Sequence, residues 1–230
     1  MILGFDSATA DTAVAVVDRG RTLFEAVEGP GPDGRPAAGR VLLSMIDEAV
    51  RVGGGWDRVA TIAVGRGPGS FTGLRIAIST ARALSQARRV PVAAVDSTAA
   101  LADGLRETAA APRIGVVDAR RGEIFAAIDR GDGASEPVVC AAVDLADALG
   151  GDLADASAAG DGAVRFRTEI EALGCAIPAD GDPANRMSAA RICELAAKME
   201  PGGARFPAGV TPKYMRRPDA ERWLERDDRS

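Results

Sequence analysis

The sequence predicts an α/β protein built from two similar halves, each with a mixed β-sheet and flanking helices. Short β-branched runs alternate with segments whose apolar residues recur at helical spacing. The order strand-strand-strand-helix-strand-helix can be followed twice along the 230 residues. Both halves open with an apolar strand that ends in an acid, Asp6 and Asp118. We expect a first lobe over 1–108, a second over 109–208, and a tail over 209–230 that could pack back on the first lobe.

The first half is predicted from strand and helix signals in turn. Three short runs separated by turn residues, among them Asp18-Arg19-Gly20, are typical of an antiparallel meander. Apolar residues at helical spacing follow, and Gly53-Gly54-Gly55 is expected to end that helix. Ser97 is the expected N-cap of the last helix in this half. The predicted strands are 2–6, 12–17, 21–27, 59–64 and 92–95, and the predicted helices are 37–52, 74–87 and 99–107.

The second half repeats this order with weaker signals. Its first strand again ends in Asp and a small residue, and Asp144 could cap a short helix. A final helix is expected to start after Ser188 and to end at Gly202-Gly203. The predicted strands are 113–119, 123–128, 138–143 and 158–160, and a further helix is predicted at 166–173.

Composition limits the classes of function. The net charge of −5 argues against this chain holding a nucleic acid alone, because nucleic-acid-binding proteins usually carry a basic face. Histidine is absent, which excludes Ser-His and Cys-His nucleophilic pairs and His-ligated metals. The two lysines, Lys198 and Lys213, lie outside any glycine-rich loop, so a P-loop is excluded. No apolar run reaches the roughly 20 residues of a membrane span, and no secretion signal is recognisable, so we expect a cytoplasmic protein.

The most informative segment is the glycine-rich run from Gly65 to Arg75, between a buried-type strand and a helix. Glycine permits close backbone approach, and the first N–H groups of a helix attract anions. Ser70 or Thr72 can cap this helix. Arg75 in the first turn opposes the helix dipole, at a cost of about 0.3–1 kcal/mol that a carboxylate or phosphate would remove. The run could equally be a tight turn with an ordinary cap.

Four motifs span almost the whole chain in the order found in the bacterial TsaB family, also called YeaZ, which the chain therefore resembles. The resemblance implies a duplicated actin/Hsp70-like fold of the ribonuclease H-like class. The glycine-rich run is the most specific of the four motifs, because strands that end in Asp would fit any actin-like protein. The motifs are Gly65-Arg66-Gly67-Pro68-Gly69-Ser70-Phe71-Thr72-Gly73-Leu74-Arg75, Gly4-Phe5-Asp6-Ser7-Ala8-Thr9, Val117-Asp118-Ala119-Arg120-Arg121-Gly122-Glu123 and Thr211-Pro212-Lys213-Tyr214-Met215-Arg216.

The resemblance implies a role in forming N6-threonylcarbamoyladenosine in tRNA. In that family the protein is a heterodimeric partner of the related transferase TsaD, and the P-loop ATPase TsaE joins the complex. This chain would then be a subunit without catalysis of its own, and tRNA would be reached only through the complex. It could also form a homodimer when TsaD is absent. A peptidase is disfavoured, because the sequence has neither histidine nor clustered metal ligands.

In the family, pairing with TsaD uses the N-terminal lobe, which implies that the helices starting near Ala37 and Leu74 supply the contact. Small residues there would let helices approach closely. The same apolar positions could instead pack on the protein's own sheet, since each helix of a two-layer lobe buries one face. The candidate interface residues are Val41, Leu42, Met45, Ile46, Leu74, Ile78 and Ala81.

A cleft between the lobes could bind ATP or ADP, which could also bind at the partner interface; no intrinsic cofactor or metal is expected. Asp6 and Asp118 would either face this cleft or close turns as hydrogen-bond acceptors. The alternative function is an active actin-like small-molecule kinase, against which stands the bulky turn Arg120-Arg121-Gly122-Glu123. The candidate nucleotide- or anion-binding residues are Asp6, Thr9, Gly67, Gly69, Ser70, Thr72, Arg75 and Asp118.

Overall fold

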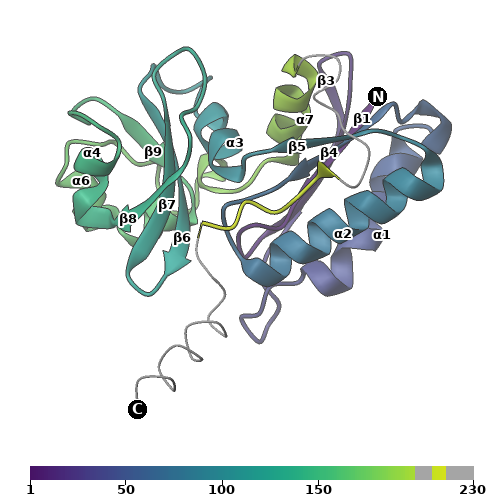
Figure 1. The fold of residues 1–230 in the computed structure, drawn as a ribbon, viewed down its shortest axis with the longest axis horizontal. Coiled ribbons are helices and arrows are strands. Elements are labelled where there is room, and N and C mark those ends of the chain that lie inside the picture. Colours follow the sequence, from purple (N-terminus) through teal and green to yellow (C-terminus); the bar gives the residue numbers. More distant parts are fainter. Residues whose placement is uncertain (200–208, 216–230) are drawn as a thin grey trace.

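Two β-sheets stand side by side in the computed structural model, with helices outside each sheet and two helices between them (Figure 1). The structure describes residues 1–199 and 209–215. Among these residues, no helix combines the length and hydropathy needed to span a bilayer. The predicted α/β class with two mixed sheets is confirmed, and the architecture is the duplicated actin-like, ribonuclease H-like fold.

The first sheet has the strand order β3-β2-β1-β4-β5. β1 pairs antiparallel with β2 and parallel with β4, so the sheet is mixed. Its outer face packs against the amphipathic helices α1 and α2 through side chains such as Leu3, Phe5 and Leu42. The elements are β1 (Ile2–Asp6), β2 (Thr12–Asp18), β3 (Arg21–Glu28), α1 (Ala38–Val52), a 3₁₀ turn (Trp56–Arg58), β4 (Thr61–Gly65), α2 (Phe71–Arg88) and β5 (Val92–Val95).

The second sheet has the order β8-β7-β6-β9, which reproduces the first four positions of the first sheet. The fifth position holds only a bridge between Ser157 and Ala176, so the duplication is unequal. Short helices cover the outer face of this sheet (Figure 1). The elements are β6 (Arg113–Arg120), β7 (Glu123–Asp129), β8 (Val138–Ala141), a 3₁₀ turn (Ala142–Asp144), α4 (Leu145–Ala148), β9 (Ser157–Ala159), α5 (Asp161–Arg165), α6 (Arg167–Glu171) and a 3₁₀ turn (Pro183–Asn185).

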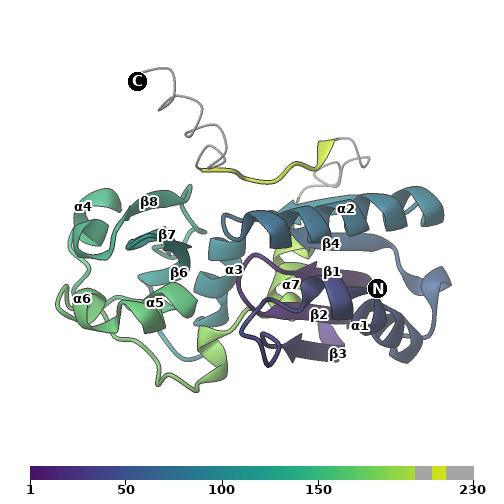
Figure 2. The same cartoon turned by 90° about the horizontal axis from the view of Figure 1, so that it is seen from below.

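The layer between the sheets consists of α3 (Ser97–Gly104) and α7 (Ala189–Lys198) (Figures 1 and 2). α3 follows the first sheet in the chain but packs on β6 and β7, whereas α7 follows the second sheet but packs on β1 and β2. Each crossing needs a glycine. A Cβ on Gly4 would lie 2.8 Å from the Ala189 carbonyl oxygen, and one on Gly115 would lie 1.9 Å from the Thr98 carbonyl oxygen.

α7 lies by sequence inside the predicted second lobe, 109–208, but it packs on the first sheet. Ser188 caps α7 as predicted, its Oγ accepting from the Arg191 N–H. The predicted stop at Gly202-Gly203 lies outside the described residues.

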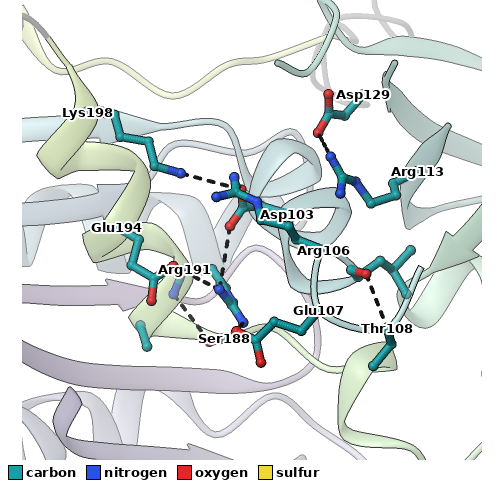
Figure 3. A network of polar contacts seen from close by, with 12 residues as sticks. Asp103, Arg106, Glu107, Thr108, Arg113, Asp129, Ser188, Arg191, Glu194 and Lys198 are labelled. Atoms are coloured by element: carbon teal, nitrogen blue, oxygen red, sulfur yellow. Dashed lines mark hydrogen bonds and ion pairs between the residues drawn. The ribbon is translucent and has the colours of Figure 1, made fainter. Parts of the chain in front are cut away.

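A charged network ties α3 to α7 (Figure 3). Arg191 Nη2 lies 2.6 Å from Glu107 Oε1, and Arg191 Nη1 lies 3.9 Å from Asp103 Oδ2. Lys198 Nζ lies 3.8 Å from the other Asp103 oxygen, and Arg106 also pairs with this carboxylate. Asp103 is almost wholly buried, so these cations offset the cost of placing its charge in the central layer.

The predicted strands and helices are found with shifted ends and two corrections. α2 begins at Phe71 rather than near Leu74, because Ser70 caps it one turn earlier. Ser97 is the first residue of α3 rather than its cap, and its Oγ donates to Asp6 Oδ2 and accepts from the Gly67 N–H instead of from a helix N–H group. The helix α5 was not predicted, because five residues are too few for a periodic signal.

Residues 209–215 run along α2, in yellow in Figure 2. Val210 is buried in the core of the first lobe, and its carbonyl accepts hydrogen bonds from Arg82. The Lys213 N–H donates to the Arg66 carbonyl at 2.8 Å. The phenol of Tyr214 lies over Phe71, with ring centroids 5.1 Å apart. The described part of the tail therefore packs on the first lobe.

Candidate functional site

A cavity of about 490 Å³ lies between the two lobes. The first lobe contributes the turn after β1 and the start of α2, and the second contributes the turn after β6. Lys213 and Tyr214 close one side. The volume suits a small-molecule ligand. The lining residues are Ala8, Thr9, Ala10, Pro36, Gly69, Ser70, Phe71, Asp118, Ala119, Arg120, Arg121, Phe125, Asp161, Lys213, Tyr214 and Met215.

The glycine-rich run packs tightly against the turn that follows β1. A Cβ on Gly69 would lie 2.3 Å from the Ala8 carbonyl oxygen, and one on Gly73 would lie 1.8 Å from the Ser7 carbonyl oxygen. The Gly67 N–H donates to Ser97 Oγ at 3.1 Å, and the Ser70 N–H donates to the Ala8 carbonyl at 2.6 Å. Gly69 and Gly73 thus allow a neighbouring backbone to approach closely. The N–H groups of Gly67 and Ser70 donate to groups within the protein and are not available to an anion.

Asp6 does not face the cavity. Its side chain is fully buried, and its two oxygens accept from the Ala8 N–H at 2.6 Å and from Ser97 Oγ at 2.6 Å. Gly65 leaves the space for this carboxylate, since a Cβ there would lie 1.6 Å from Asp6 Oδ2. Burial raises the pKa of Asp6, against the lowering effect of these hydrogen bonds. Of the two roles left open for Asp6, the structure shows the turn acceptor and not the cleft-facing acid, and the carboxylate also joins β1 to the start of α3.

Replacing Asp6 by Asn should keep the bond from the Ala8 N–H through the amide oxygen and reverse the bond to Ser97, whose Oγ would accept from the amide N–H, while removing the buried charge. Because the folded pKa is raised, ionisation destabilises the native state as pH rises above the ordinary value of 3.8. We therefore expect Asp6→Asn to be more stable than the parent at pH 7, with the difference vanishing near pH 4. Thermal unfolding from pH 4 to 8 measures this, with the exposed Asp132→Asn as control. A variant less stable than its parent at pH 7 would contradict it.

Asp118 lines the cavity, but its charge is already neutralised. Asp118 Oδ2 lies 2.9 Å from Arg165 Nη1 and 3.2 Å from Arg120 Nη1, and Oδ1 accepts from the Arg120 N–H at 2.8 Å. The Asp118 N–H donates to Asp161 Oδ1 at 3.0 Å. Burial raises the pKa of Asp161, and the neighbouring Asp118 charge adds to this effect. This wall of the cavity is therefore an internal ion-pair cluster.

The remaining predicted site residues are divided between the cavity and the surface. Thr9 and Ser70 line the cavity, and Thr9 Oγ1 also accepts from the Asp11 N–H. Thr72 is exposed on α2 and does not line the cavity. Arg75 points away along the outside of α2, where its guanidinium stacks 3.8 Å from the centre of the Phe71 ring.

Sequence reasoning missed Asp161 and Arg165. A signal was available in the sequence Gly160-Asp161-Gly162 directly after β9, which resembles Gly65-Arg66-Gly67 at the end of β4. A Cβ on Gly160 would lie 2.0 Å from the Val116 carbonyl oxygen.

The candidate interface residues are mostly covered within the chain. Only Val41 and Met45 keep part of their side chains exposed. Each of the other five is at most 2% exposed and packs between its helix and the first lobe, so it cannot contact a partner in this conformation. These five are Leu42, Ile46, Leu74, Ile78 and Ala81.

No group of three or more His, Cys, Asp or Glu residues is arranged to hold a metal within residues 1–199 and 209–215. What the cavity offers chemically is a wall of paired arginines and acids, the hydroxyls of Thr9, Ser70 and Tyr214, and the rings of Phe71, Phe125 and Tyr214. This set can bind a ligand by stacking and hydrogen bonds.

Known proteins match this chain in sequence and in structure. The family model described as "TsaD: tRNA N6-adenosine threonylcarbamoyltransferase" matches residues 39–225. The tRNA threonylcarbamoyladenosine biosynthesis protein TsaB of Escherichia coli is 32% identical over 127 residues, which cover 55% of this chain and 53% of that protein. The TsaB protein of Haemophilus influenzae is 32% identical over 128 residues, covering 54% and 51%. The match spans about half the length of these curated relatives.

Solved structures extend the likeness over nearly the whole chain. YeaZ from Pseudomonas aeruginosa superimposes with a TM-score of 0.76 at 28% identity, covering 93% of this chain and 99% of that one. A second structure, titled as similar to peptidase YeaZ from the same organism, gives a TM-score of 0.77 at 27% identity, covering 94% and 99%. The chain therefore belongs to the TsaD domain family and, within it, to the TsaB group, also called YeaZ.

Proposed function

We propose that this chain takes part in tRNA threonylcarbamoyladenosine biosynthesis as a non-catalytic subunit that binds and organises a TsaD-type transferase. The observation that carries the proposal is the state of the two strand-end acids. An actin-like kinase would present both to a nucleotide, whereas here Asp6 is buried and Asp118 is held by Arg120 and Arg165. The names of the matched TsaB proteins support the same pathway.

The proposed contact surface is the groove between the outward faces of α1 and α2, not the buried stripe. These helices lie next to each other. A Cβ added to Gly39 of α1 would lie 3.8 Å from Ile76 Cδ1 of α2. Leu43, four residues after Gly39, shares its face and is 64% exposed. Ala83, seven residues after Ile76, is also exposed on the matching face of α2. Small side chains beside an exposed leucine suit close packing against another helix pair.

A double substitution Leu43→Glu with Ala83→Glu should abolish capture of the TsaD-type partner while leaving the monomer folded, because both side chains are solvent-exposed in the free chain. An unpaired charge at the centre of an interface costs on the order of 3–5 kcal/mol, or more than a hundredfold in affinity. Co-purification from cells that express both proteins measures this. The matched control is Val143→Glu, which alters an equally exposed apolar residue on the second lobe (60%).

The biological readout is the content of N6-threonylcarbamoyladenosine in tRNAs that read ANN codons. In a strain depleted of its own TsaB, the parent chain and Val143→Glu should restore the modified nucleoside, and the double variant should not. Restoration by the double variant would refute the groove as the contact surface. Failure of the parent chain to restore the modified nucleoside would refute its role in this pathway. Turnover of a substrate by the purified chain alone would refute the non-catalytic role.

A further inference from the structure

One flank of α2 carries three arginines at a heptad spacing. Arg75 and Arg82 lie on one side of the helix, since seven residues make almost two whole turns, and Arg89 is the left-handed C-cap seven residues further on. The row is about 21 Å long at 1.5 Å per residue. α2 contains no Asp or Glu, although the whole chain has a net charge of −5. We call these three residues the arginine row.

The charges of the arginine row are not neutralised within the described residues. Arg82 donates to the carbonyl oxygen of Val210, and Arg75 donates to Tyr214 Oη at 3.2 Å. Both partners are neutral, so they hold the side chains in place without cancelling the charge. Other arginines of the same chain are paired with carboxylates, for example Arg167 with Asp180 and Arg186 with Asp11. Cations without a carboxylate partner in residues 1–199 and 209–215 are available to an external anion.

Two exposed aromatic rings extend the arginine row toward the mouth of the cavity. Phe71 is 38% exposed and lies four residues before Arg75, on the same flank of α2. Tyr214 is 44% exposed and packs on Phe71 from residues 209–215. The chain has only nine aromatic residues, and these two are among its most exposed large apolar side chains. Rings next to aligned arginines are the combination on which single-stranded nucleic acid stacks and is held by its phosphates.

We propose that the arginine row together with Phe71 and Tyr214 is a contact surface for RNA. In the assembled complex this surface would contact the bound tRNA. The inference rests on the proposed function for the identity of the RNA. An acidic protein partner would also satisfy the charges, but it would not explain two exposed rings at the end of the row. The net charge of the chain limits this surface to an auxiliary contact, which strengthens binding by another subunit.

The arginine row and the groove that faces the TsaD-type partner lie on different sides of α2, about 100° apart around the helix axis. Ile76 and Ala83 point toward α1, whereas Arg82 and Arg75 contact residues 209–215. Figure 2 shows α2 between α1 and the yellow C-terminal segment. A partner seated on the groove would therefore leave the row free to contact RNA.

The test measures binding of an unmodified tRNA transcript, one that reads ANN codons, to the full-length chain in complex with its TsaD-type partner. Affinity is measured by fluorescence anisotropy between 50 and 300 mM salt. The triple variant Arg75→Gln, Arg82→Gln, Arg89→Gln should reduce the slope of log K against log salt by roughly 2 to 3, at 0.7–0.9 for each phosphate contact. Tyr214→Leu should weaken binding about fivefold or more without changing the slope, because stacking is not electrostatic.

The matched control is Arg130→Gln, an exposed arginine of the second lobe that bonds only a carbonyl oxygen. Because Arg82 also holds residues 209–215, the double variant Arg75→Gln, Arg89→Gln is measured as well and should lower the slope by roughly 1 to 2. Unchanged slopes in both variants would overturn the inference. It would also be overturned if the variants lost binding to the TsaD-type partner while their affinity for RNA stayed the same. If the parent chain fails to restore tRNA modification yet the slopes fall, the proposed function fails and the RNA surface stands.

Discussion

Replacing Gly115 by Ala should destabilise the protein by about 3 kcal/mol or more, at the upper end of the range for overpacked cores. The added Cβ would lie 1.9 Å from the carbonyl oxygen of Thr98 and 2.9 Å from the N–H nitrogen of Ala102. Both atoms belong to the backbone of α3, so no side-chain rotation relieves the clash. α3 would have to move off β6, which opens the layer between the sheets. Urea unfolding followed by circular dichroism measures the change.

Gly104→Ala is the matched control. Gly104 lies on α3, the helix that Gly115 contacts, and a Cβ added to Gly104 would have no atom within 4 Å. This substitution should shift the free energy of unfolding by less than about 1 kcal/mol, toward greater stability, since it restricts the unfolded chain. Equal effects of the two substitutions would show that α3 does not press on β6 as the structure describes.

Replacing Asp129 by Ala should cost about 3–5 kcal/mol, the range for breaking a buried ion pair. Asp129 Oδ2 lies 2.7 Å from Arg113 Nη2, and both residues are at least nine-tenths buried (Figure 3). Oδ1 also accepts from the Gly131 and Gly133 N–H groups, at 2.8 and 3.1 Å. The substitution therefore leaves the buried Arg113 guanidinium without its carboxylate partner and removes the hydrogen bonds that hold the turn after β7.

The pH dependence of this effect follows from the pKa of Asp129. Burial opposes its charge, but the hydrogen bonds from Gly131, Arg113 and Gly133 outweigh burial and lower the pKa. A lowered folded pKa contributes stability above the ordinary value of 3.8 that is lost as pH falls. The difference between parent and Asp129→Ala should thus shrink from pH 7 to pH 3. Asp132→Ala, in the same turn and exposed, should change stability by less than about 0.5 kcal/mol at either pH.

Sequence patterns were sufficient for the two sheets, because each half opens with an apolar strand and repeats the same order of elements. They were not sufficient for the central layer. The apolar stripe of α7 shows that one face is buried, but not which sheet covers it, and the chain reaches back to β1 instead of staying on β6. Gly4 and Gly115 carry this information only once the crossing helices are known.

The candidate site was predicted in part, for a related reason. An Asp at the end of a strand can point toward a cleft or into a turn, and only the tertiary contact with Ser97 decides this for Asp6. Likewise Leu42 and Ile78 are apolar at helical spacing whether a partner or the protein's own sheet covers them. The cavity residues Asp161 and Arg165 come from a short helix with no periodic signal. The glycines beside Asp161 indicate a tight turn, but not its approach to Asp118.

The exchange of helices between the two sheets makes the halves mutually dependent. Without α7 the inner face of the first sheet, with Ala13, Ala15 and Ala63, would be open to water; without α3 the second sheet would lose its cover over Val117 and Phe125. Each half has a hydrophobic core on its outer face, but the core between the sheets is built from both halves. The two lobes should accordingly melt as one cooperative unit, and a cut anywhere between α3 and α7 would yield pieces that must reassociate in order to fold.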